Sequence, residues 1–171
     1  MTSGYLSISA WEVLILRKLN AAVDRFAYSH PRFGIPNLMK FLVGIMAVVF
    51  VLDLFSNGYA SYMLYFDADL VLQGELWRLV TWMFLPISGS LFWIFINLSF
   101  YYFIGTALEE YWGTAKFTLF YLACAVLMVV FGMISTLWNP LPVVHSGMLN
   151  RILFLAFATL YPDALIRVYL I

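Results

Sequence analysis

Long apolar runs, separated by short polar or proline-containing breaks, dominate the pattern of the chain. They cover residues 38–55, 90–108, 117–137 and 144–160. A helix needs about 20 mostly apolar residues to cross the hydrocarbon core of a bilayer, and charged side chains inside such a segment are rare. The pattern therefore predicts four membrane-spanning helices.

The stretches between these runs have different characters. Residues 56–86 mix apolar positions with four charges, Asp67, Asp69, Glu75 and Arg78, which are too many for a span in lipid. We expect a partly embedded loop with short helices there, and a turn at 109–116 between the second and third spans. Residues 164–171 look like the start of a fifth element, so the helical domain is expected to be truncated after its fourth span.

The amino-terminal segment has a helical period but does not read as a span. Trp11, Ile15, Leu19, Ala22 and Phe26 recur at intervals of three and four, which places them on one face of a helix over residues 9–28. Such a helix either lies in the membrane interface or packs on the end of the protein itself, and the sequence leaves both interpretations open. With the proline-containing linker 29–36, it divides the chain into residues 1–36 and a transmembrane domain over 37–171.

Composition supports an all-α integral membrane protein. The chain is 64% hydrophobic and 11% charged, with a mean hydropathy of +0.93. Nine basic and nine acidic residues cancel, so no charge excess favours a nucleic acid. The single cysteine, Cys124, lies in an apolar run, and no phosphate-binding loop or metal-ligand spacing is present. We therefore expect neither a metal nor a cofactor.

The distribution of basic residues predicts the orientation, because lysine and arginine concentrate in cytoplasmic flanks. The flanks on one side of the predicted membrane contain Arg17, Lys18, Arg25, Arg32, Lys40, Lys116 and Arg167, whereas the other side has Arg78 alone. The sequence thus predicts a multi-pass protein of the cell membrane with a cytoplasmic amino terminus.

Two groups of polar and small residues stand out against this apolar background. Trp77 and Arg78 form a pair in the loop, where we expect the ring at the headgroup level and the guanidinium in water or on a lipid phosphate. Gly105, Glu109 and Gly113 follow at intervals of four, on one helical face. Glycines there allow close helix approach, and the carboxylate can accept hydrogen bonds from loop amides. Both groups are expected to be structural.

Those two motifs resemble the rhomboid family from about residue 38 to the end. The resemblance implies a rhomboid-like helical bundle, in which Ser146 followed by Gly147 matches the nucleophile and Asn97 matches the oxyanion-side asparagine. Trp93 stands where the family has a histidine, and Val144 replaces the leading glycine of the nucleophile motif. The catalytic positions therefore match only in part.

A serine nucleophile also needs a base within hydrogen-bond reach. His145 is adjacent to Ser146 and so points to another side of the helix, and His30 lies in the amino-terminal linker. The family's histidine on a sixth span has no counterpart in these residues. The expectation is that the catalytic pair is missing, as in rhomboid-like proteins of clostridial and related bacteria, which the chain also resembles at residues 32–39 and 149–163.

Three functions remain open at this stage. The resemblance to rhomboid pseudoproteases and derlins implies a protein that binds transmembrane segments of partner proteins, with Trp93 and Phe103 as candidate contacts. One alternative is an intramembrane serine protease that uses Ser146 and Asn97, and another is a structural subunit of a larger membrane complex. Membrane lipid is expected around the spans in each case, while the polar pair Asn150 and Arg151 stays unexplained.

Overall fold

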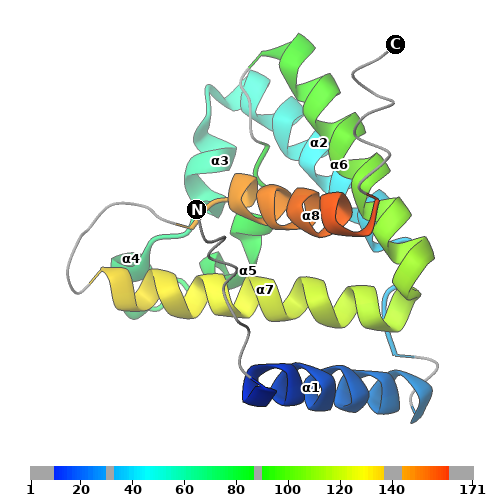
Figure 1. Cartoon of the computed structure of the whole chain (residues 1–171). Coiled ribbons are helices and arrows are strands. Elements are labelled where there is room, and N and C mark those ends of the chain that lie inside the picture. Colours follow the sequence, from blue (N-terminus) through cyan, green and yellow to red (C-terminus); the bar gives the residue numbers. More distant parts are fainter. Residues whose placement is uncertain (1–9, 30–32, 87–89, 137–143, 162–171) are drawn as a thin grey trace, which may run out of the picture.

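The computed structural model describes residues 10–29, 33–86, 90–136 and 144–161, and within these ranges the chain folds into helices without strands. Figure 1 shows α7 and α8 running alongside each other in opposite directions, with α1 on the far side of α7 from α8. Short helices fill the segment between α2 and α6. The elements are α1 Ala10–Ser29, α2 Leu38–Ser56, α3 Tyr59–Leu64, α4 Ala68–Leu72, α5 Arg78–Thr81, the 3₁₀ helix η1 Trp82–Phe84, α6 Leu91–Trp112, α7 Thr114–Ser135 and α8 Ser146–Leu160.

Three helices among the described residues, α2, α6 and α7, are long and apolar enough to cross a membrane, with 19, 22 and 22 residues. The prediction of an all-helical membrane protein is confirmed. The fourth predicted span corresponds to α8, which is apolar but has only 15 residues. The expected fifth element, 164–171, lies outside the described residues.

The predicted turn at 109–116 is wrong, because both helices continue into it. α6 runs to Trp112 and α7 begins at Thr114, so Gly113 alone connects them. Its backbone φ is +80°, a value that residues other than glycine rarely adopt. The Gly113 N–H donates a hydrogen bond to the Glu109 carbonyl at 2.8 Å. The polar composition of this stretch resembled a loop, whereas a single glycine is sufficient to reverse the chain.

The core lies where α2, α6 and α7 meet the short helices. Met39 of α2 and Leu108 of α6 are fully buried in it, as is Phe117 of α7. The buried hydroxyls of Tyr101 and Tyr121 lie 2.9 Å apart and share a hydrogen bond between α6 and α7. This bond satisfies two polar groups that would otherwise be costly inside an apolar bundle.

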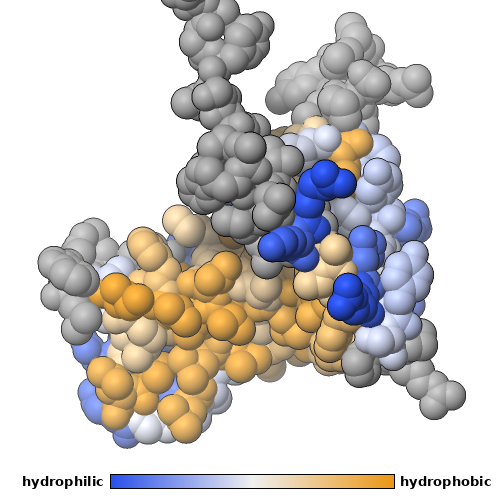
Figure 2. Space-filling view, turned by 60° about the horizontal axis from the view of Figure 1, so that its bottom comes forward, coloured by the Kyte–Doolittle hydropathy of each residue, from blue (hydrophilic) through white to orange (hydrophobic). Residues whose placement is uncertain are grey.

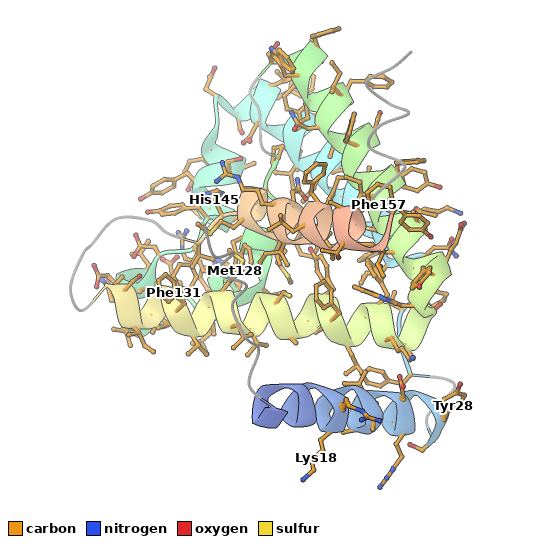
Figure 3. All side chains as sticks on the ribbon, in the orientation of Figure 1. Lys18, Tyr28, Met128, Phe131, His145 and Phe157 are labelled. Carbon is orange, nitrogen blue, oxygen red and sulfur yellow. The ribbon has the colours of Figure 1, made fainter. Side chains whose placement is uncertain are left out.

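Helix α1 contacts the bundle through α7. Asp24 and Lys116 form an ion pair with 2.5 Å between oxygen and nitrogen, and the Phe26 ring packs edge-on against Phe33 at 5.1 Å. Lys18 points away from α7 in Figure 3. The amino-terminal helix therefore packs on the protein, and its basic side chains Arg17, Lys18 and Arg25 are exposed.

Apolar side chains cover much of the exterior, as expected for a surface that faces lipid. Val126, Leu127 and Phe131 on α7 are each at least 60% exposed. Figure 2 shows a broad hydrophobic face with hydrophilic side chains gathered toward one side of it. A soluble protein would rarely expose so large an apolar area, so the surface supports the membrane assignment independently of helix length.

Gly105 provides a test of how α2 and α6 approach each other. A Cβ at this position would overlap Cγ and Sδ of Met39, which is fully buried and has little room to move. We expect Gly105→Ala to lower the free energy of unfolding by roughly 1–3 kcal/mol, the usual cost of overpacking. Denaturation in detergent micelles, followed by circular dichroism, measures this change.

Gly44→Ala is the matched control, because a Cβ there meets no atom within 4 Å. It should leave stability unchanged or slightly raise it. Shortening Met39 to Ala in the Gly105→Ala background should recover part of the loss. Equal stability of the two single variants would contradict the packing argument.

Candidate functional site

The buried guanidinium of Arg78 organises the segment between α2 and α6. Arg78 is 1% exposed, and its Nη1 donates to the carbonyls of Tyr62 and Tyr65, both at 2.9 Å. Its Nε donates to the Glu75 carboxylate at 2.6 Å. The guanidinium carbon also lies 4.8 Å from the centre of the Tyr65 ring, within the range of a cation–π contact.

This geometry corrects one expectation. The guanidinium does not reach water or a lipid phosphate, because it is enclosed by the loop. The reason is that α3 ends at this point, and the final carbonyls of a helix have no partner inside the helix. Arg78 supplies donors to two such carbonyls, and Glu75 neutralises its charge.

Trp77 and Thr81 complete the same capping arrangement. The indole N–H of Trp77 donates to the Met63 carbonyl at 3.3 Å, and the Thr81 hydroxyl donates to the Leu64 carbonyl at 2.9 Å. Together with Arg78, these side chains satisfy the carbonyls of residues 62–65 in succession. The Trp77 ring itself remains half exposed.

Two aspartates fix the other ends of this segment. Asp53, near the end of α2, accepts hydrogen bonds from the Ser61 amide at 2.8 Å and from the Ser61 hydroxyl. Asp67 caps α4, accepting from the amides of Asp69 and Leu70 at 2.9 and 3.1 Å. Partial burial opposes ionisation of Asp67, but the hydrogen bonds from Leu70, Tyr65 and Asp69 outweigh it and lower the pKa of the carboxyl.

The stripe on α6 connects three parts of the chain. Gly105 allows α2 to approach, and Gly113 reverses the chain. The Glu109 carboxylate accepts hydrogen bonds from the Asn37 amide at 3.0 Å and from the Thr114 hydroxyl at 3.2 Å. It therefore ties the start of α2 to the junction of α6 and α7.

Ser146, the candidate nucleophile, begins α8 and is 3% exposed. Its hydroxyl donates to the Leu85 carbonyl at 2.7 Å. Val144 before it is buried, and it faces Gly132 of α7, where a Cβ would overlap the valine side chain. The serine thus attaches α8 to the end of the segment between α2 and α6, and its proton is engaged by a carbonyl rather than by a base.

Asn97, the candidate oxyanion residue, lies on α6. It borders a hollow of about 400 Å³ between α6 and α8, which we call the α6–α8 groove. Its side-chain amide donates to the Trp93 carbonyl at 2.8 Å, one turn back on its own helix. The groove is lined by Ile96, Asn97 and Phe100 of α6, by Asn150 and Arg151 of α8, and by His145, which precedes α8.

The two candidate partner contacts are exposed on α6. Trp93 is 57% exposed and precedes Asn97 by four residues, so it continues the line of the groove. Phe103 is 61% exposed and packs edge-on against Phe157 of α8, with ring centres 6.0 Å apart. Figure 3 labels His145, the residue before α8, and Phe157, toward the other end of the helix.

Two connections could not be read from the sequence. Ser146 donates to the backbone carbonyl of Leu85, and Arg78 donates to the backbone carbonyls of Tyr62 and Tyr65. Every residue has such a carbonyl, so the sequence does not indicate which one is the partner. The described residues contain no group of three or more His, Cys, Asp or Glu side chains placed to hold a metal ion.

Three membrane-length helices, a segment between α2 and α6 capped by Trp77 and Arg78, and a short helix that begins at Ser146 define a polytopic helical membrane protein. One family's sequence model, described as Rhomboid domain, matches residues 73–161, just over half of the 171 residues. The chain belongs to the rhomboid family. No curated protein and no solved structure matches it.

Replacement of Arg78 tests its role in the segment between α2 and α6. Arg78→Ala leaves Glu75 without its partner and two carbonyls without donors, so we expect a loss of about 3 kcal/mol in unfolding free energy, typical of a broken buried pair. Arg78→Lys should recover only part, because an ammonium cannot reproduce the fork of the guanidinium. Denaturant titration in micelles measures all the variants.

Arg25→Ala is the control, since Arg25 is exposed on α1. A loss for Arg78→Ala no larger than that of Arg25→Ala would show that the buried contacts contribute nothing to stability.

Proposed function

We propose that this rhomboid-family protein does not cleave peptide bonds and instead binds transmembrane helices of partner proteins. The observation that carries the proposal is the buried bond from Ser146 to the Leu85 carbonyl. A serine becomes a nucleophile when a base takes its proton, and this hydroxyl donates to a carbonyl, which is not a base. Trp93 at the position of the family's histidine supports the same conclusion.

Helix binding is supported by the groove beside α6. The wall of the groove combines apolar side chains such as Ile96 and Phe100 with the polar side chains of Asn97 and Arg151. Lipid chains have no polar group to offer at this position, whereas membrane helices associate through close packing and hydrogen bonds between side chains. A partner helix therefore matches this surface better than lipid does.

The orientation is part of the proposal. We infer a cytoplasmic amino terminus in the cell membrane, because Arg17, Lys18, Arg25 and Lys40 are exposed near one another in the chain. Lys116 joins this group through its ion pair with Asp24. Such a concentration of basic residues is typical of cytoplasmic flanks.

Labelling with a fluorophosphonate tests the absence of serine chemistry. We expect no adduct on the purified protein in bilayers, while an active rhomboid protease treated in parallel is labelled. Ser146→Ala should only lower stability, by about 1 kcal/mol for one lost hydrogen bond. The exposed Ser99→Ala variant is the control for stability. Labelling that disappears in Ser146→Ala would instead establish the protease.

Photocrosslinking tests helix binding. A benzoylphenylalanine residue at Trp93 or Phe103 should form adducts that map, by mass spectrometry, to transmembrane segments of a reproducible partner. The same residue at Val126, exposed on α7, is the control and should capture mainly lipid. Lipid adducts alone at all three positions would contradict the proposal, and a stoichiometric assembly of several chains would favour a structural subunit.

A further inference from the structure

The α6–α8 groove contains a positive charge with no described counter-charge. Arg151 is exposed and lines the groove. The ion pairs within the described ranges join Arg78 to Glu75 and Lys116 to Asp24, so no described carboxylate pairs with Arg151. A charge on an apolar membrane helix is costly and usually meets a partner inside the bundle or across an interface.

The groove also contains side-chain amide oxygens that accept no hydrogen bond from the described residues. Asn150 lines the same groove, and its buried Oδ1 has no donor in the part of the chain that the structure describes. The Asn97 amide is engaged with its own helix, which leaves its carbonyl oxygen as an acceptor. Phe100, Ile104 and Phe154 make the remaining wall apolar. The two free amide oxygens are acceptors, so they can take donors from a ligand, whereas Arg151 is the group that favours an anion. The groove therefore fits an apolar body that carries one anionic group for Arg151.

The level of Asn97 along α6 indicates where that group comes from. Asn97 follows the first residue of α6, Leu91, by six residues, or about 9 Å at 1.5 Å per residue. Leu91, Phe92 and Phe95 before it are each more than 65% exposed. Exposed apolar side chains of this kind belong in the hydrocarbon core of the bilayer, whereas lipid phosphates lie at the boundary of that core. A side chain of another membrane helix reaches this level directly.

We propose that the groove binds a partner transmembrane helix through an Asp or Glu side chain whose carboxylate pairs with Arg151. The proposal rests on the helix-binding function above and specifies the chemistry of the partner. A guanidinium offers two parallel N–H donors, and a carboxylate accepts both. Apolar side chains on the same partner helix then pack along Phe100 and Phe154.

Binding of designed peptides tests this proposal. The probes are leucine-rich membrane-spanning peptides, each with one Asp, Asn or Lys in an outer third of the helix, and an all-leucine peptide. Energy transfer from labelled peptide to labelled full-length protein in phosphatidylcholine bilayers reports affinity. We expect the Asp peptide to bind about tenfold more tightly than the leucine peptide, the range for polar contacts between membrane helices.

Variants of Arg151 assign the preference to this side chain. Arg151→Leu should abolish it, Arg151→Lys should retain most of it, and Arg151→Glu should transfer it to the Lys peptide. Arg25→Leu, at an exposed arginine on α1, is the matched control and should leave the preference intact. Exchange of preference by Arg151→Glu also shows that the variant is folded.

The other outcomes separate this inference from the function on which it rests. Equal, tight binding of Asp and leucine peptides would overturn the role of Arg151 and leave helix binding in place. Absence of binding by every peptide would overturn both. Loss of the Asp preference when phosphatidylglycerol is added, with retained lipid that disappears in Arg151→Leu, would assign the site to an anionic lipid and overturn the proposal.

Discussion

The four carbonyls at the end of α3 impose the constraint on which the segment between α2 and α6 depends. A helix that ends inside a membrane protein leaves acceptors with no water to bind them. Trp77, Arg78 and Thr81 satisfy the carbonyls of residues 62–65 with indole, guanidinium and hydroxyl donors. Arg78 thereby becomes buried, and the burial of its charge requires Glu75. The short helices between α2 and α6 are stable because this set of polar groups closes on itself.

The same principle explains the state of Ser146. The segment 82–85 leads from η1 toward α6, and the Leu85 carbonyl needs a donor. Ser146, in the first turn of α8, supplies this donor and so attaches α8 to the segment that follows η1. In this rhomboid-family chain the serine hydroxyl therefore joins two elements of the fold. This contact agrees with the sequence, which has Trp93 where the family has a histidine and Val144 where it has a glycine.

Much of the architecture was accessible from the sequence, because hydrophobicity and charge are direct signals of a membrane environment. The first span, 38–55, agrees with α2 to within a residue, and the short helices of 56–86 were expected from the charges there. The junction of α6 and α7 was predicted wrongly, because the adjacent charges of Glu109 and Glu110 are typical of a loop. In the structure both residues belong to α6, and the Glu109 carboxylate accepts a hydrogen bond from the Asn37 amide. The partners of Arg78 and Ser146 were out of reach because they are backbone carbonyls distant in sequence. The α6–α8 groove likewise depends on how two helices pack, which no local pattern encodes.

The single-residue connection at Gly113 affects how the protein is made. Two helices of 22 residues joined by one glycine leave no slack for one to enter the bilayer while the other waits outside. Their insertion during synthesis must therefore be coupled, as one helical hairpin. The hydroxyl bond between Tyr101 and Tyr121 forms within that hairpin, so its polar groups can be satisfied before any later segment of the chain arrives.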